Sequence, residues 1–282
     1  MRSRKILSTA CTTALTATLV VCLSSTLARA DEVGSKPIED ETAIKAGKQL
    51  YDRACVYCHG TEGRGDGPVA YFVARDQAPR PRDFTSEPFK FRSTPQGQLP
   101  VDDDIFRVIT NGRAGLMPAF RGLRAEDRWR LVYYVKALNP RFQSGEEAGT
   151  PIDVGPAAPA TTASIANGAK IYDRVQCWKC HGRSGLGDGP SAPTLRATGS
   201  DAGDAGDDPF GEPAGAGGLP IPPANLTRPS SFAYGSQPQD VYRTLMTGMD
   251  GVPMPSFAGF FKSEHEAWDL VNFILSLNAE GR

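Results

Sequence analysis

Around several motifs of the chain, apolar residues recur every three or four positions, the spacing that places them on one face of an α-helix. Two such faces resemble each other although they lie far apart in the sequence. They are formed by Ile44, Gly47, Leu50, Tyr51 and Ala54, and by Ile165, Gly168, Ile171, Tyr172 and Val175. The sequence contains no convincing alternation of apolar and polar residues, the pattern typical of a half-buried strand. An all-α protein is therefore predicted.

Capping and breaking residues predict where further helices begin and end. Acidic residues stabilise the first turn of a helix through its dipole, and proline cannot continue a helix. The boundary residues are Asp102–Asp104 and Gly112 for one helix, Pro238 and Asp240 at the start of its counterpart, Glu126, Asp127, Asn139 and Pro140 for a third, and Ser263 as the cap of the last.

The predicted helices belong to an internal repeat. Matched blocks of sequence recur in the same order, which indicates two homologous domains. Besides two cysteine-containing stretches, the matched pairs are Gly47–Arg53 with Gly168–Arg174, Ile105–Gly112 with Val241–Gly248, Met117–Phe120 with Met254–Phe257, and Trp129–Val135 with Trp268–Ile274.

The repeat predicts helical domains over residues 38–142 and 164–282. Between them, residues 143–163 form a Pro/Ala-rich stretch without apolar periodicity, which is typical of a semi-extended linker. An acidic, Gly-rich insertion at 198–218 has no long counterpart in the first domain. We expect it to form a surface loop.

The first residues of the chain have the composition of an export signal. Basic residues precede an apolar stretch that ends at Ala28–Ala30, a small-x-small cleavage site. A signal peptide over residues 1–30 predicts export to the periplasm. The alternative is a retained N-terminal membrane anchor, which the serine and threonine residues of the stretch disfavour. A lipoprotein signal at Cys22 is also disfavoured, because Val21 precedes it.

Composition narrows the class of protein. Of 282 residues, 40 % are hydrophobic and 22 % charged, which is ordinary for a soluble globular protein. The formal net charge of −1, together with export, gives no support for nucleic-acid binding. Arg113, Arg121 and Arg124 surround Met117 and could steer a protein partner. The alternative, that they are merely solvated surface charges, stays open.

Two related stretches carry the candidate chemistry: ACVYCHGTEGRGDGP at residues 54–68 and QCWKCHGRSGLGDGP at residues 176–190. Cys-x-x-Cys-His is the attachment signature of a c-type haem. Cysteines three residues apart share a helical face, so both can reach the haem vinyl groups, and the next residue can bring an imidazole under the iron. The residues predicted to hold two haem c groups are Cys55, Cys58 and His59, and Cys177, Cys180 and His181.

Three other interpretations of the cysteines are less favoured. A zinc site needs about four ligands, and beyond the motifs the mature chain offers only His265 and no cysteine. A thioredoxin-like redox pair is expected in a βαβ setting, which the helical pattern lacks. Cysteines that merely fill the core would hardly recur with a histidine attached.

An electron-carrying haem commonly has methionine opposite histidine, and the thioether raises the reduction potential. Met117 and Met254 stand before proline in matched blocks, each in a loop ahead of the final helix of its domain. We therefore predict that these two methionines are the second iron ligands. Met249 stays open as the alternative for the second haem.

On these residues, each half of the chain resembles a class I c-type cytochrome domain, and the whole resembles a tandem dihaem cytochrome c over about residues 41–140 and 164–279. The resemblance implies that the first helix of each domain crosses the last. It also implies that a proline carbonyl accepts a hydrogen bond from the ligating imidazole, with Pro68 and Pro190 as the candidates. The implied crossing residues are Gly47, Tyr51 and Tyr134, and Gly168, Tyr172 and Phe273.

These features predict a periplasmic protein that transfers electrons between redox protein partners, alone or as a subunit of a larger oxidoreductase or respiratory chain. Membrane association would need a retained N-terminal segment. The alternative is a dihaem enzyme, either peroxidase-like or a sulfur-compound dehydrogenase. It fits less well because both domains keep a candidate methionine and no spare mature cysteine remains.

Overall fold

The protein is helical in the part of the chain that the computed structural model describes. Within that part there are isolated bridges but no strand, which confirms the all-α fold class. The predicted signal 1–30 and insertion 198–218 lie outside it. The described residues are 36–72, 81–86, 88–113, 116–196 and 220–278.

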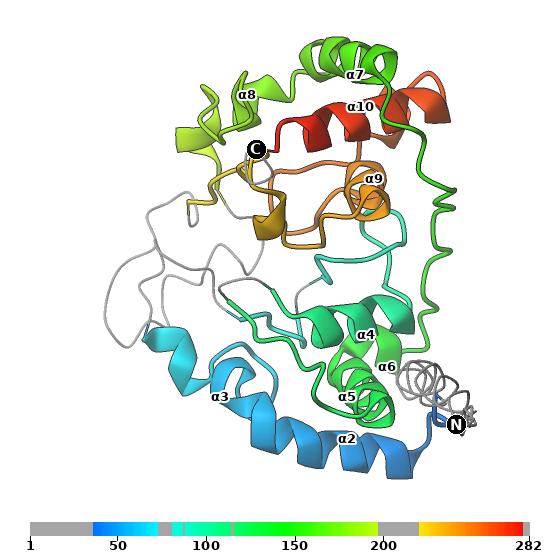
Figure 1. The fold of residues 1–282 in the computed structure, drawn as a ribbon. Coiled ribbons are helices and arrows are strands. Elements are labelled where there is room, and N and C mark those ends of the chain that lie inside the picture. The colour runs from blue at the N-terminus through cyan, green and yellow to red at the C-terminus, as the bar shows by residue number, and fades with distance from the viewer. Residues whose placement is uncertain (1–35, 73–80, 87, 114–115, 197–219, 279–282) are drawn as a thin grey trace, which may run out of the picture.

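The described helices form two lobes in tandem (Figure 1). Domain 1 contains α2 (Glu41–Ala54), α3 (Val56–His59), η1 (Pro68–Tyr71), α4 (Asp102–Asn111), α5 (Ala125–Leu138) and α6 (Pro140–Gln143). Domain 2 contains α7 (Thr162–Arg174), α8 (Trp178–His181), η2 (Ala192–Thr194), η4 (Pro229–Ser231), α9 (Pro238–Thr247), η5 (Ala258–Phe260) and α10 (Glu264–Ser276).

The predicted helix boundaries agree with the structure. Helix α4 begins at Asp102, and α10 is capped by the Ser263 side chain, which accepts a hydrogen bond from the Glu266 amide. Gly112 and Gly248 follow α4 and α9 with φ of 63° in both cases. Glycine adopts this left-handed conformation without the steric cost of a Cβ atom, so both helices end at the same point of the repeat.

The first and last long helices of each domain cross at a glycine. A Cβ atom at Gly47 in α2 would lie 2.0 Å from the Arg130 carbonyl oxygen in α5. In domain 2, a Cβ atom at Gly168 in α7 would lie 2.0 Å from the Asp269 carbonyl oxygen in α10. The backbones therefore approach more closely than any residue larger than glycine permits.

An aromatic pair packs beside each crossing. The rings of Tyr51 and Tyr134 are 5.0 Å apart between centroids, and those of Tyr172 and Phe273 are 5.2 Å apart. Both pairs are tilted, as the quadrupoles of aromatic rings favour. The crossing that the family resemblance implies is therefore present in both domains.

Each domain has its own hydrophobic core behind the crossing. In domain 1, Trp129 stacks on Phe106 with centroids 4.1 Å apart, and in domain 2, Trp268 stacks on Tyr242 at 4.4 Å. All except Phe106, which packs against the core, are buried. The two cores hold the crossed helices rigidly, so the loops between them start from fixed positions.

The segment 144–161, which joins α6 to α7, lies along one side of both lobes (Figure 1). The Gly149 amide donates to the Leu99 carbonyl at 3.1 Å, and the Ile152 amide donates to the Ser93 carbonyl at 2.8 Å. At its far end, the Asn272 side chain of α10 donates to the Pro159 carbonyl at 3.2 Å. The connection is therefore hydrogen-bonded to both domains.

Candidate functional site

The two Cys-x-x-Cys-His motifs form single helical turns directly after the first long helix of each domain. The His59 amide donates to the Cys55 carbonyl at 2.9 Å, and the His181 amide donates to the Cys177 carbonyl at 2.9 Å. Each turn, α3 or α8, thus brings both cysteines and the histidine of its motif together. All four thiols are free.

The glycine-rich stretch after each motif folds back on that turn. The Gly65 amide donates to the His59 carbonyl at 2.9 Å, and the Gly67 amide donates to the Cys58 carbonyl at 3.2 Å. The Tyr51 hydroxyl, from α2, donates to the Gly60 carbonyl at 2.8 Å. The second repeat has the same bonds around His181, and the bond from the Tyr172 hydroxyl to the Gly182 carbonyl is 2.6 Å long.

Each imidazole is oriented by a backbone carbonyl. His59 Nδ1–H donates to the Arg82 carbonyl at 3.0 Å, and His181 Nδ1–H donates to the Ala224 carbonyl at 2.9 Å. A carbonyl only accepts, so the proton is on Nδ1 and the lone pair on Nε2 is free to bind iron. This is the arrangement that a ligating histidine needs.

The expectation that Pro68 and Pro190 supply these carbonyls is wrong. Pro68 begins η1, which packs against α3, and Pro190 precedes η2, which packs against α8, so the chain runs past the motif here without presenting either carbonyl to the imidazole. It returns to the histidine only after residues 73–80 in domain 1 and 197–219 in domain 2. The second pass brings the carbonyls of Arg82 and Ala224 to the imidazoles.

A five-residue repeat marks the returning segments and could have revealed them from sequence. Pro81–Thr85 reads PRDFT and Pro223–Thr227 reads PANLT. The Asp83 carboxylate accepts from the Thr85 amide at 2.7 Å, and the Asn225 side chain accepts from the Thr227 amide at 2.9 Å. These matched turns place the carbonyl of the second residue of the repeat, Arg82 or Ala224, against the histidine of the motif.

The amide of the fourth residue of this repeat joins each returning segment to the glycine-rich stretch that follows the Cys-x-x-Cys-His motif. Phe84 N donates to the Gly63 carbonyl at 2.7 Å, and Leu226 N donates to the Gly185 carbonyl at 2.6 Å. In domain 1 the Phe84 ring also stacks on the His59 imidazole, with centroids 4.6 Å apart. The imidazole is thus held at its edge and on one face.

Burial determines the protonation of the motif side chains. It lowers the pKa of His59 and of His181, which favours the neutral imidazole that coordinates metals. Burial also raises the pKa of Cys55 to about 11 and that of Cys177 to about 12. A redox-active dithiol needs a lowered thiol pKa, so these cysteines do not fit that interpretation.

A cavity of about 570 Å³ opens beside the motif of domain 2. Its walls are largely apolar, and they include Cys177, Cys180 and His181 together with Met249 and Met254. This residue set fits a haem c: two thiols for attachment, an imidazole on one side and a thioether from a distant loop. Both methionines line the cavity, so Met249 stays open as the alternative ligand.

The methionine loops of the two domains share one backbone pattern. The Arg113 amide donates to the Met117 carbonyl at 2.8 Å, and the Met249 amide donates to the Met254 carbonyl at 2.9 Å. A Cβ atom at Gly112 would lie 2.5 Å from the Met117 carbonyl oxygen. The glycine after α4 therefore lets the loop close tightly on the helix end.

Two features are absent from the described residues. Among them, no cluster of three or more histidine, cysteine, aspartate or glutamate side chains could hold a metal ion. Within the same ranges, no helix combines the length and the apolar character needed to cross a bilayer.

Comparisons with known proteins agree with the geometry. The family described as cytochrome c oxidase, cbb3-type, subunit III matches residues 42–135, and the family described as cytochrome c matches residues 165–278. A chain of the reducing HAO-like protein complex of Kuenenia stuttgartiensis is 37 % identical, with a TM-score of 0.72, over 87 % of this chain and 100 % of that chain. No curated protein sequence matches significantly.

Proposed function

Because the chain belongs to the cytochrome c family and carries two cytochrome c domains in tandem, we propose that it is a periplasmic electron-transfer subunit. One haem c is covalently bound in each domain, and its iron supplies the one-electron redox chemistry. In the proposed route, an electron enters one domain from a redox protein, crosses the domain interface and leaves from the other. The export-like segment 1–30 supports the location.

The observation that carries this proposal is the cavity of domain 2. It brings the motif cysteines and His181 to the same apolar cavity as Met254, from the loop before α10. Its residues would attach and ligate the haem, and the Ala224 carbonyl fixes the imidazole. We assign His59 and Met117 the same ligand roles in domain 1, because the motif turns have matching backbone bonds and the amide of Arg113 bonds to the Met117 carbonyl as that of Met249 bonds to the Met254 carbonyl.

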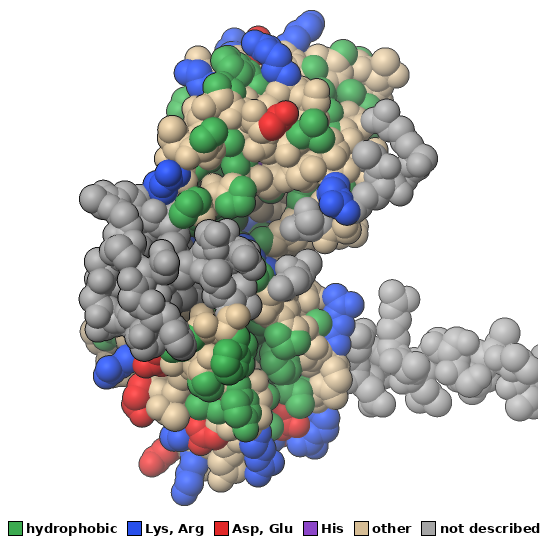
Figure 2. Space-filling model, turned by 90° about the vertical axis from the view of Figure 1, so that its left-hand side faces the viewer, with side chains coloured by type: hydrophobic (Ala, Val, Ile, Leu, Met, Phe, Trp, Pro, Cys, Tyr) green, Lys and Arg blue, Asp and Glu red, His purple; other side chains and the backbone are tan. Residues whose placement is uncertain are grey.

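The surfaces beside the two motifs differ in a way that supports a partner on domain 1. Tyr57 and Phe72 are 59 % and 81 % exposed, and Val69 is also exposed. Figure 2 shows apolar side chains gathered on one face of the domain-1 lobe, with charged side chains around them. The matched positions of domain 2 are Lys179, Thr194 and Ser191, which are polar.

We propose that this face, formed by Tyr57, Val69 and Phe72, contacts a redox protein that carries its own cofactor. Apolar contacts around a redox centre exclude water and let two centres approach closely. The similar chain from Kuenenia stuttgartiensis belongs to a protein complex, which supports a role as a subunit. In the proposed arrangement, domain 1 exchanges electrons with this protein and domain 2 with a second one.

Anaerobic reductive titration of the holoprotein tests the proposal. We expect each chain to accept one electron at each of two haems, and the oxidised protein to show the near-infrared band of methionine-ligated ferric iron. Met117→Ala and Met254→Ala should each remove one haem's part of that band and lower that haem's potential, because the thioether stabilises ferrous iron.

Met249→Ala is the matched control, because Met249 lines the same cavity as Met254. It should leave the band intact, and loss of the band would reassign the second ligand to Met249. Rapid turnover of peroxide or of a reduced sulfur compound by the purified protein would instead contradict the carrier function and favour an enzyme.

A further inference from the structure

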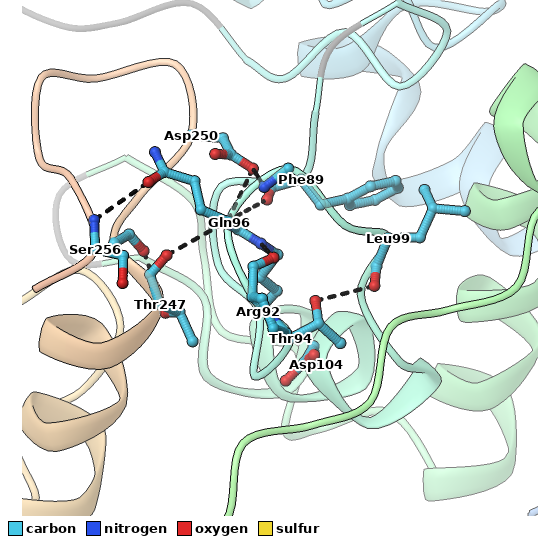
Figure 3. Close-up of polar contacts among 12 residues, drawn as sticks. Phe89, Arg92, Thr94, Gln96, Leu99, Asp104, Thr247, Asp250 and Ser256 are labelled. Carbon is cyan, nitrogen blue, oxygen red and sulfur yellow. Dashed lines mark hydrogen bonds and ion pairs between the residues drawn. The ribbon is translucent and has the colours of Figure 1, made fainter. Parts of the chain in front are cut away.

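One segment of domain 1, residues 89–99, reaches across the interface to the methionine loop of domain 2 (Figure 3). At its centre is Arg92, whose side chain is 0 % exposed. Its Nη1 atom lies 2.9 Å from the Asp250 carboxylate, which is 9 % exposed. Asp250 stands between Met249 and Met254, inside the loop that carries the proposed iron ligand.

The guanidinium of Arg92 bonds to both domains at once. Nη2 donates to the Thr247 carbonyl at 3.2 Å, at the C-terminal end of α9. Nε donates to the Pro95 carbonyl at 3.0 Å, and Nη1 donates to the Phe89 carbonyl at 3.3 Å, both in its own segment. A buried charge without a partner is costly, so Arg92 and Asp250 hold each other in place.

Two further hydrogen bonds join the same segment to the loop on both sides of Met254. The Gly97 amide donates to the Asp250 carboxylate at 3.3 Å, before the methionine in sequence. The Ser256 amide donates to the Gln96 side chain at 3.2 Å, after it. The loop that presents Met254 is therefore fixed at two points by residues of domain 1.

The segment that makes these contacts is itself rigid. The Thr94 hydroxyl donates to the Leu99 carbonyl at 3.0 Å, and the Ser93 amide donates to the Asp104 carboxylate at 2.8 Å. Thr94 and Asp104 are fully buried. Arg92 thus stands on a fixed support anchored to α4, so its contacts can restrain the partner loop.

The sequence does not repeat the Arg92–Asp250 ion pair in the opposite direction. Residues 86–101 of domain 1 are a longer segment than residues 228–237 at the same place in domain 2. The residue of domain 1 that matches Asp250 is Ala114, which cannot form an ion pair. The sequence therefore provides this ion pair for the methionine loop of domain 2 and not at the matched position of domain 1.

We propose that Arg92 is a positioning residue through which domain 1 holds the Met254 loop of domain 2, so that methionine ligation at the second haem depends on the intact interface. This inference rests on the proposed ligand role of Met254. A loop fixed at both ends loses less conformational freedom when its methionine binds iron. Releasing it favours dissociation of the methionine and admits an external ligand.

Imidazole titration of the ferric holoprotein, followed by loss of the near-infrared band, tests the role of Arg92. Imidazole competes with methionine for iron, so the wild type should show one phase for each haem, and Met254→Ala identifies the phase of domain 2. In Arg92→Met/Asp250→Leu, which removes both buried charges together, we expect imidazole to bind the second haem about 10- to 100-fold more tightly. The phase of the first haem should not move.

Arg92→Lys keeps the charge but cannot make all four contacts, so it should give a smaller shift of the same phase. It also tests the role of Arg92 if the double variant does not fold. Lys136→Met is the control, because Lys136 bonds to Asp102 and Glu39 within domain 1 only. It should leave the domain-2 phase unchanged.

An unchanged domain-2 phase in folded Arg92 variants, or an equal shift of both phases, would overturn the inference. The haem content of the wild type separates this result from failure of the proposed function. Fewer than two haems per chain would contradict the proposed function itself. Two haems with an unshifted phase would contradict only the clamp.

Discussion

At the residue scale, Glu266 shows how one carboxylate can join two helices. Its two oxygens accept hydrogen bonds from Arg174 of α7 at 2.6 and 2.8 Å, and one also accepts from the Lys262 amide at 2.9 Å. The Arg174 hydrogen bond, followed by the bond from Lys262, lowers the pKa of Glu266 to about 2. The ionised form is therefore favoured in the folded protein.

This lowered pKa predicts an acid-sensitive contribution to the stability of domain 2. A carboxylate with a depressed folded-state pKa stabilises the fold above its unfolded value of 4.5, and the contribution is lost as the pH falls towards about 2. We expect Glu266→Gln to lower the free energy of unfolding at pH 7 and to flatten its decrease between these pH values. Denaturant unfolding at several pH values measures both effects. An unchanged slope in the variant would contradict the assignment.

At the element scale, the crossing of α2 and α5 depends on the absence of a side chain at Gly47. We expect Gly47→Ala to destabilise the protein by about 1–3 kcal/mol, because its methyl group would overlap the Arg130 carbonyl. The control is Gly122→Ala in an exposed turn, where a Cβ atom meets nothing within 4 Å and the change should stay within about 0.5 kcal/mol. Thermal unfolding of the holoproteins compares them, and equal stability would contradict the crossing.

Elements with strong local signals were predictable, and long-range contacts were not. The helix at Asp102 and the Ser263 cap follow from spacing and capping chemistry within a few residues, whereas the glycine crossings were implied by the family resemblance. The carbonyls that orient the imidazoles come instead from Arg82 and Ala224, beyond variable loops. The loops before these carbonyls differ in length, so the spacing from the histidine does not predict the contact. In the sequence, only the repeat of the PRDFT and PANLT segments marks where the chain returns.

At the scale of the whole molecule, the interface has an approximate symmetry that arises from the repeat. Arg107 of α4 and Arg243 of α9 occupy matched positions, and both guanidinium groups lie over the ring of Tyr234, at 5.7 and 5.6 Å from its centroid. The Tyr234 hydroxyl donates to Asp104 at 3.1 Å, and its ring stacks on Phe91. Tyr234 also lines the cavity of domain 2, so the interface and the second site share a wall.

The different surfaces of the two domains predict which one binds the partner. Tyr57→Lys/Phe72→Thr gives domain 1 the residues that domain 2 has at the same positions, and it should weaken co-purification of the partner from native membranes. The matched control is Leu186→Arg, which gives domain 2 the residue found at Arg64 and should leave binding intact. Loss of the partner in Leu186→Arg alone would place the docking face on domain 2.

The sequence by itself determined the two-domain helical architecture and the covalent attachment of two haems, because the repeat, the helical periodicity and the Cys-x-x-Cys-His turns are local patterns. Only the tertiary structure decided which carbonyl orients each histidine and which domain restrains the other. His59 meets Arg82, and Arg92 meets Asp250, through contacts between segments far apart in the chain. Such contacts depend on how distant segments pack, and the spacing within one segment does not encode its partner.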